Sequence, residues 1–133
     1  MSLLLLDTTF LIDAEHDESS LDDVIGDDDD VAVSAISVAE LTVGVELSTG
    51  KRKRERQAFV DDLIAVVPVI PYDVIVVGFH ADLLSAVRRA GRPRGAHDLI
   101  IAATAYATGR EVVSADPRAF EALPGITLRR RRG

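Results

Sequence analysis

The sequence predicts an α/β domain built around a parallel β-sheet. Short, nearly continuous apolar runs alternate along the chain with longer segments that have a helical spacing of apolar residues. Continuous apolar runs are typical of strands covered on both faces, and an alternating order of strand and helix is typical of parallel sheets. A chain of 133 residues with 47% hydrophobic residues can bury its own core. We therefore expect residues 1–133 to form a single domain, with a flexible basic tail at 129–133.

About five strands are expected. The first is unbroken apolar sequence that ends abruptly at Asp7. The third contains Pro68, which lacks a backbone N–H and therefore indicates a strand at an edge of the sheet. The expected strands are 2–6, 31–33, 66–70, 112–115 and 126–128.

Helical segments are expected between these strands. Asp73 is placed to cap a long helix that Gly91 closes, and Gly109 ends the most apolar helix. That last helix has almost no polar face and should be central. Gly50 and the basic cluster after it should separate two helices, and 27–30 should be an exposed loop. The expected helical segments are 10–14, a turn or two within 19–26, 37–47, 54–65, 73–89 and 96–108.

The composition excludes several classes of protein. The chain has no cysteine, which rules out disulfides, thiolate metal sites and cysteine nucleophiles. No apolar run approaches the roughly 18–20 residues of a membrane span. The apolar run at 3–6 lacks the positively charged flank of a signal peptide. We therefore expect a cytoplasmic protein that does not bind membranes.

The charges are segregated along the chain. A net charge of −7 argues at first against a nucleic-acid partner. However, negative charge is concentrated at 22–30, and positive charge at 51–54, 88–94 and 129–132. Basic segments around an acidic site would suit a substrate with a phosphate backbone. The alternative is that these segments are solvated faces and, at the C-terminus, a loose tail.

Four acidic residues lie where strand-like and helix-like sequence meet: Asp7, Glu40, Asp98 and Asp116. In a parallel sheet the loops that follow the strands share one edge, so acids far apart in the sequence can meet there. Carboxylates close together raise one another's pKa unless a cation binds between them, and hard oxygen ligands suit Mg²⁺ or Mn²⁺. The pattern predicts a metal-dependent phosphodiesterase site.

Each acid also has a purely structural explanation. Asp7 and Asp116 could be helix N-caps, the second one followed by a proline. Ser37 and Glu40 match a capping box, in which each side chain bonds the other's backbone N–H. Asp98 would interact favourably with the helix macrodipole in the first turn of its helix. The joint pattern of the four acids favours a site over four separate caps.

Four stretches of the sequence resemble motifs of the PIN-domain family, especially its VapC-type toxins. The stretches occur in the family's order and span almost the whole chain. They are LLLDTTFLID at 4–13, SVAEL at 37–41 followed by GVE at 44–46, GAHDLIIAATA at 95–105, and VVSAD at 112–116 followed by Phe120 and by LPG at 123–125.

The resemblance implies a three-layer α/β/α sandwich and an Mg²⁺- or Mn²⁺-dependent endoribonuclease that is the toxin of a toxin–antitoxin pair. Family members form homodimers and are held inactive, in hetero-oligomers, by a small antitoxin protein that also binds operator DNA. The helix at 73–89 carries an unusually broad apolar face, including Val74, Ile75 and Val77. This face is either buried within the monomer or available to a second copy or to the antitoxin.

The resemblance also implies roles for individual residues. The core acids of the family match Asp7, Glu40 and Asp98, a more variable fourth position matches Asp116, and a hydroxyl position near the metal matches Thr8 or Thr9. Asp7 and Asp98 would bind the first metal, and the other two acids would complete the site directly or through water.

Three further residues precede or adjoin Asp98 in the sequence. Arg92 and Arg94 are candidates for contact with substrate phosphates, and they could equally be solvated loop residues. His97 is a candidate for contact with the substrate and stands where acidic or small residues are common in the family.

Two other functions fit parts of the pattern. A signalling receiver domain also places acids at the end of a parallel sheet, but it needs a lysine after a late strand, and the only lysines here are Lys51 and Lys53. A catalytically inactive PIN-like module could bind RNA or protein, although the presence of all four acids argues against it.

Overall fold

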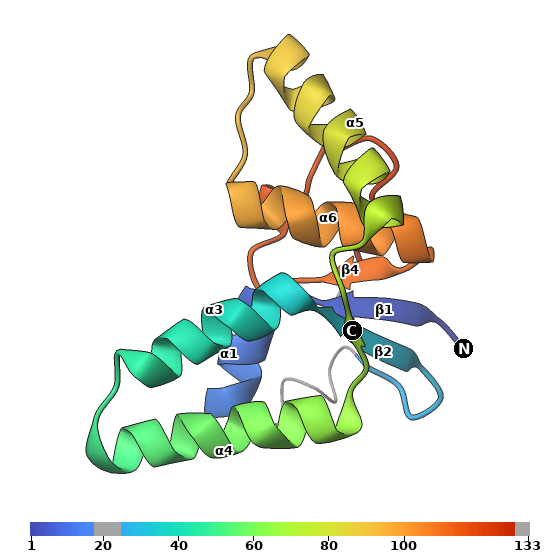
Figure 1. Cartoon of the computed structure of the whole chain (residues 1–133). Coiled ribbons are helices and arrows are strands. Elements are labelled where there is room, and N and C mark those ends of the chain that lie inside the picture. Colours follow the sequence, from blue (N-terminus) through green and yellow to red (C-terminus); the bar gives the residue numbers. More distant parts are fainter. Residues whose placement is uncertain (18–24, 130–133) are drawn as a thin grey trace.

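The computed structural model describes residues 1–17 and 25–129 of the chain. A four-stranded sheet lies between two layers of helices (Figure 1). Most of the helical turn expected within 19–26, and the arginines at 130–132, lie outside the described residues. The expected three-layer α/β/α fold is confirmed.

The sheet is parallel throughout and has the order β3-β2-β1-β4. The central strand β1 pairs with two neighbours, so that Leu5 lies opposite Ala32 on one side and Val112 on the other. The strands are β1 (Leu3–Leu6), β2 (Asp30–Ser34), β3 (Val69–Ile70) and β4 (Glu111–Val113).

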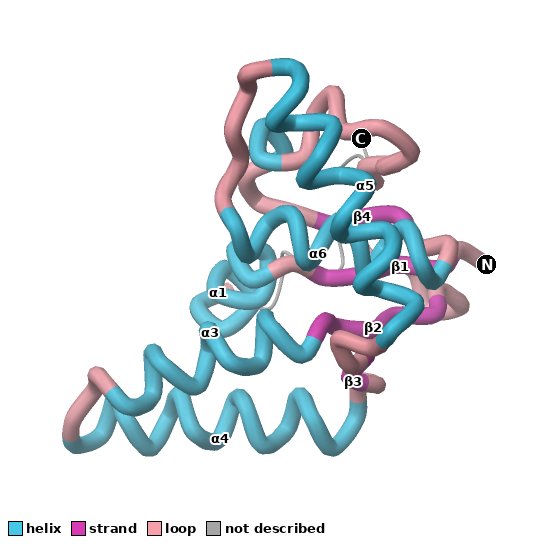
Figure 2. The backbone as a smooth tube through the Cα atoms, turned by 45° about the horizontal axis from the view of Figure 1, so that its top comes forward, coloured by secondary structure: helices cyan, strands magenta, loops and turns pink. Residues whose placement is uncertain are grey.

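The helices form the two outer layers, and Figure 2 shows them on opposite sides of the strands. One layer contains α1 (Thr8–His16), α3 (Ala35–Glu46) and α4 (Gly50–Val66). The other contains α5 (Val74–Ala90) and α6 (Ala96–Thr108), which pack against each other. A short 3₁₀ helix, η1 (Pro117–Ala119), follows β4.

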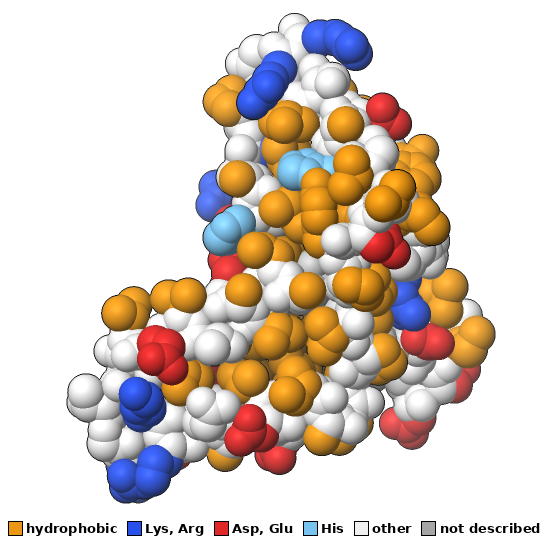
Figure 3. All heavy atoms as spheres, in the orientation of Figure 1, with side chains coloured by type: hydrophobic (Ala, Val, Ile, Leu, Met, Phe, Trp, Pro, Cys, Tyr) orange, Lys and Arg blue, Asp and Glu red, His pale blue; other side chains and the backbone are white. Residues whose placement is uncertain are grey.

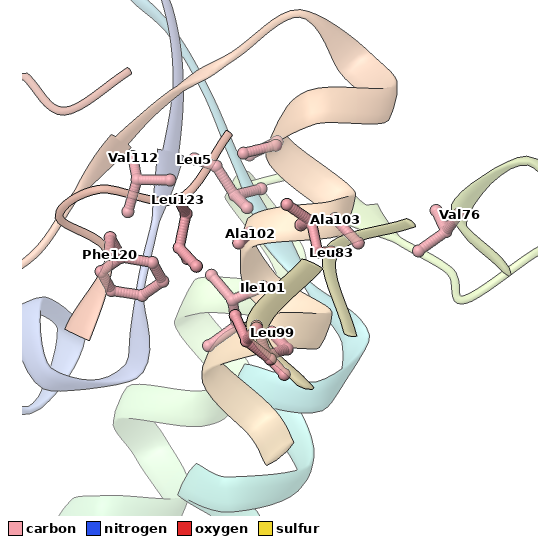
Figure 4. Packing of buried hydrophobic residues seen from close by; sticks show 13 residues of the cluster. Leu5, Val76, Leu83, Leu99, Ile101, Ala102, Ala103, Val112, Phe120 and Leu123 are labelled. Atoms are coloured by element: carbon pink, nitrogen blue, oxygen red, sulfur yellow. The ribbon is translucent and has the colours of Figure 1, made fainter. Parts of the chain in front are cut away.

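The alternation of side chains along β1 explains why both faces of the sheet are covered. Leu5 belongs to a buried cluster with α5 and α6, whereas Leu4 and Leu6 belong to a second cluster with α1, α3 and α4. Figure 4 shows Leu5 facing Ala102 of α6, beside Leu123 from the C-terminal segment. Because successive residues of β1 are buried on opposite faces of the sheet, every residue of the strand has to be apolar.

The central position expected for the most apolar helix is confirmed. Five consecutive residues of α6, from Ile101 to Ala105, are buried. The expected ends are also confirmed: Asp73 accepts hydrogen bonds from two backbone N–H groups of α5, and Gly91 and Gly109 close α5 and α6 in the left-handed conformation.

Three expectations about local structure were wrong. Residues 126–128 form no strand and make only one bridge, between Leu128 and Val112, so the sheet has four strands. The start of the expected third strand is helical instead, because the N–H of Val67 continues the α4 hydrogen-bond pattern to Leu63. Strand β3 therefore begins only after Pro68, at the edge of the sheet as expected. The basic cluster at 51–54 lies within α4.

The apolar face of α5 extends beyond its buried stripe. Val76 is only 2% exposed, but Val74 is 85% and Ile75 64% exposed, so burial in the monomer does not account for this face. Figure 3 shows hydrophobic side chains gathered over α5. Within the described residues, no helix is both long and apolar enough to cross a membrane.

Gly125 provides a test of how the C-terminal segment packs on α6. Its φ is +75°, and a Cβ at this position would overlap the ring of Tyr106. Gly125→Ala should therefore lower the free energy of unfolding by about 2–4 kcal/mol, from backbone strain and overpacking together.

Gly109→Ala is the matched control for this change, measured by urea denaturation. Gly109 has a φ of +65° but open space around it, so only backbone strain of about 1–2 kcal/mol is expected. Equal losses in the two variants would contradict the packing of Gly125 against Tyr106.

Candidate active site

Asp7 lies at the C-terminal end of β1 and is the N-cap of α1. Its carboxylate accepts hydrogen bonds from the Phe10 N–H at 2.8 Å, the Thr9 hydroxyl at 2.9 Å and the Ser114 hydroxyl at 2.5 Å. The side chain is almost fully buried, with 2% exposed. The N-cap explanation is therefore confirmed, and the role of Asp7 in a site stays a prediction, since capping uses only part of the hydrogen-bonding capacity of Asp7.

Glu40 reaches the same region from α3. Its Oε1 accepts a hydrogen bond from the Thr8 hydroxyl at 2.7 Å, and its Oε2 lies 3.3 Å from His97 Nδ1. The alternative of a capping box was wrong, because Ser34 rather than Ser37 caps α3. Residue 37 is therefore one turn inside the helix, where its buried side chain lies 3.0 Å from the Thr8 hydroxyl.

Asp98 lies in the first turn of α6, beside the other acids. Burial raises the pKa of its carboxyl, and the charges of Glu40 and Asp116 raise it further, while His97 lowers it. Gly95 leaves room for this side chain, since a Cβ there would come within 2.9 Å of Asp98 Oδ2.

The four acids lie at one edge of the sheet, with Asp98 close to the other three. Burial also raises the pKa of Asp7, hydrogen bonds from Ser114, Phe10 and Thr9 oppose this, and the charge of Asp98 adds to the increase. The Asp98 carboxylate is thus close enough to Asp7, Glu40 and Asp116 to interact with all three charges.

Asp116 is the most exposed of the four acids. It occupies the N-cap position of η1 before Pro117, but its side chain makes no capping hydrogen bond. Its Oδ1 lies 3.7 Å from Arg118 Nε, in an exposed ion pair. Asp116 therefore occupies the expected N-cap position, but its carboxylate does not accept a hydrogen bond from the helix.

Ser114 is a positioning residue that the sequence did not reveal. Its hydroxyl donates to Asp7 and accepts from the Asp116 N–H at 2.9 Å, and it lies 3.2 Å from the Thr9 hydroxyl. The residue is thus one link between the end of β1 and the segment after β4, beside the Ala115 N–H, which donates to the Thr9 hydroxyl at 3.1 Å. Ser114 belongs to the VVSAD stretch, but the sequence alone assigned it no role, because the link depends on the placement of β4 beside β1.

The two loop arginines have different surroundings. The Arg94 guanidinium donates to the backbone carbonyls of Arg118, Ala119 and Glu121 at 2.7–3.1 Å. These hydrogen bonds tie the loop before α6 to the segment after β4, and contact of Arg94 with substrate stays a prediction. Arg92 is exposed on the same loop.

The donor atoms at this edge are carboxylate and hydroxyl oxygens, the type that Mg²⁺ and Mn²⁺ prefer. As the side chains stand, no three His, Asp or Glu residues within 1–17 and 25–129 are arranged to hold a metal ion. The chemistry of the donors thus fits a hard divalent cation, while metal binding would require some side chains to rotate.

Comparison with known proteins assigns the family. The sequence profile of the PIN domain matches residues 4–126. The chain belongs to the PIN-domain family. The match includes Asp7, Glu40, Asp98 and Asp116, which the fold brings to one edge of the sheet.

Relatives within this PIN-domain family include proteins named VapC. The chain is 31% identical to the tRNA(fMet)-specific endonuclease VapC of Salmonella typhimurium over 74% of this chain and 73% of that protein. The fold also matches a crystal structure of DNA-bound VapBC from Salmonella typhimurium, with a TM-score of 0.81 and 27% sequence identity. The match covers 96% of this chain and 97% of that chain. VapBC-5 from Mycobacterium tuberculosis, from the VapBC family of toxin–antitoxin systems, is 27% identical, with a TM-score of 0.79 and coverage of 98% and 99%.

The raised pKa of Asp7 predicts how stability depends on pH in metal-free buffer. The folded state binds a proton at Asp7 more tightly than the unfolded state, in which the pKa of this carboxyl is near the ordinary aspartate value of 3.8. Charged Asp7 therefore lowers stability at neutral pH, and this penalty disappears as the pH falls through the raised pKa. Asp7→Asn should melt roughly 2–4 °C higher than the wild type at pH 7.

This difference in melting temperature should shrink as the pH is lowered towards 3.8, and calorimetry in the presence of a chelator would measure it. Asp82→Asn, on the exposed surface of α5, is the control and should melt like the wild type. A lower melting temperature for Asp7→Asn at pH 7 would contradict the expected effect of burial.

Proposed function

We propose that this protein is an Mg²⁺- or Mn²⁺-dependent endoribonuclease and the toxin of a toxin–antitoxin pair. The main support is that the fold brings Asp7, Glu40, Asp98 and Asp116 together at the C-terminal edge of the sheet. Such a group of acids is unfavourable without a cation. The endonuclease and toxin–antitoxin relatives add support for RNA as the substrate.

The proposed reaction is hydrolysis of an RNA phosphodiester, and hydrogen bonds hold two of the four acids at the edge of the sheet. Asp7 is held by a backbone N–H and two hydroxyls, so its carboxylate cannot rotate freely. Thr8 and His97 hold the two oxygens of Glu40. A bound divalent cation would lower the pKa of a water molecule and stabilise charge on the phosphoryl oxygens. Asp7 and Asp98 would hold the cation, and Glu40 and Asp116 would complete the site.

The exposed face of α5 is proposed to bind protein partners. Val74, Ile75 and Val77 are 85%, 64% and 45% exposed, which is unusual for neighbouring aliphatic residues of a helix. We propose that a second copy of the chain covers part of this face, and that a cognate antitoxin joins in a hetero-oligomer and provides any contact with operator DNA. We also propose that the protein acts in the cytoplasm.

An inactive PIN-like module that only binds RNA or protein is the alternative function. It would keep the fold and the exposed face of α5 but would bind no divalent cation. The presence of all four acids, in spite of their mutual repulsion, favours the enzyme.

Removal of the Asp98 charge tests the enzyme directly. Asp98→Asn should reduce Mn²⁺-dependent RNA cleavage by at least about 100-fold, because one carboxylate of the proposed metal site is lost. The fold should remain intact, as measured by circular dichroism, and Asp82→Asn should cleave like the wild type. Full cleavage by folded Asp98→Asn would falsify this assignment, and failure of the wild type to bind Mn²⁺ in calorimetry would favour the inactive module.

Light scattering tests the proposed contact through α5. The wild type should have the mass of a dimer at tens of micromolar. Ile75→Glu should shift it to a monomer, because the change places a charge in the centre of the apolar face. Ile64→Glu is the control, since Ile64 is also exposed (49%) but lies on α4. A monomeric wild type would count against the dimer.

A further inference from the structure

The first two turns of α4 carry a dense group of positive charges, Lys51, Arg52, Lys53 and Arg54, named here the basic tip. All four side chains are exposed. Figure 3 shows Lys and Arg side chains gathered at the outer end of the arm formed by α3 and α4. Four consecutive cations are unusual in a chain with a net charge of −7.

Helix stability does not provide that explanation. Cations are unfavourable near a helix N-terminus, where the macrodipole is already positive, and α4 has no acidic residue in its first turn. Lys51 pairs with Glu55 at 3.7 Å in an exposed contact that contributes little. Within residues 1–17 and 25–129, Arg52, Lys53 and Arg54 form no ion pair. The basic tip therefore costs stability in the isolated chain.

The basic tip is held in a fixed position relative to the candidate active site. Arg56, just below it, donates to the Gly44 carbonyl at 3.0 Å and to the Ser48 hydroxyl at 2.7 Å, which fastens α4 to the end of α3. Val60 of α4 is buried against the same cluster as Leu41 of α3. The site acid Glu40 lies on α3, six residues before that helix ends, which is about 9 Å of helix.

The chemistry of this surface suits a phosphate backbone. A hollow of about 510 Å³ lies along the same face of α4, lined by Gly50, Lys53, Arg54, Gln57, Ala58 and Asp61. Its cations are Lys53 and Arg54, and it has no aromatic ring on which a base could stack. The Gln57 amide already donates to the Asp61 carboxylate at 2.9 Å, so the two cations are the groups that would contact phosphates. Contacts of this type depend on the phosphates and not on the base sequence.

We propose that the basic tip binds the phosphate backbone of the RNA substrate, several nucleotides away from the phosphodiester at the carboxylate site. This inference rests on the proposed ribonuclease function and adds where the rest of the RNA lies. The tip supplies affinity that is independent of sequence and sensitive to salt, and it takes no part in the chemical step.

The test is a triple variant, Arg52→Gln/Lys53→Gln/Arg54→Gln, in the cleavage-deficient Asp98→Asn background. Fluorescence anisotropy would measure its affinity for a labelled, mixed-sequence single-stranded RNA of about 20 nucleotides. Loss of three phosphate contacts should weaken binding at least about tenfold at low salt and reduce the slope of log K against log salt by about 2. An RNA of about four nucleotides, too short to reach the tip, should bind equally to both proteins.

The control is Arg88→Gln/Arg89→Gln, which removes two positive charges at a position far from the basic tip, in the last turn of α5. Arg88 and Arg89 lie in the last turn of α5, where cations stabilise the helix. The control should melt at a lower temperature and change RNA affinity less than about threefold, whereas the tip variant should melt at the same or a higher temperature. Weaker binding together with unchanged or increased stability is a result that a merely structural role cannot give.

Unchanged RNA affinity of the tip variant, or an equal loss in the control, would overturn the inference. Binding of a poly-glutamate peptide by the wild type but not by the tip variant, with RNA affinity unchanged, would instead assign the surface to an acidic protein segment. If the wild type cleaves RNA with Mn²⁺ but the tip variant binds RNA as tightly as its parent, the proposed function remains and only the role of the tip is refuted. A wild type that neither binds nor cleaves RNA would remove both.

Discussion

The buried carboxylate at the end of the central strand is the constraint on which the rest of this structure depends. Asp7 is almost completely removed from water, so its charge has to be compensated by hydrogen bonds. The donors come from the start of α1 and from Ser114 after β4. The position of α1 and the register of β4 on β1 are therefore both tied to one side chain, and a small shift in either would leave a buried charge without donors.

Electrostatic repulsion at the same edge gives the site its character. The charges of Glu40 and Asp116 raise the pKa of Asp98, and the charge of Asp98 raises the pKa of Asp7. Thr8 and His97 hold Glu40 in place in spite of this repulsion. A fold that needed only helix caps at these positions could use neutral serine or asparagine. The retention of charge, at a cost in stability, is what favours a function that includes a cation.

A second unfavourable arrangement, the cations of the basic tip, lies on the arm formed by α3 and α4. The two arrangements have opposite signs and are joined by one helix hairpin, which Arg56 and the buried Val60 keep rigid. The net charge of −7 therefore describes the chain poorly, because the field near the surface depends on where each group lies. The proposed ribonuclease would use the acids for chemistry and the cations for holding its substrate.

The sequence by itself determined the order of strands and helices, the buried central strand and the acids that meet at one edge. These follow from local properties: the unbroken apolar run that ends at Asp7, the apolar surface of α6, and the rule that parallel strands end on one side. Tertiary structure decided the link from Ser114 to Asp7, the contact of His97 with Glu40, and the hydrogen bonds of Arg94. It also decided that 126–128 would form one bridge in place of a strand. Each of these depends on the distance between segments far apart in the chain, up to 107 residues for Ser114 and Asp7, and no local pattern of residues encodes such a distance.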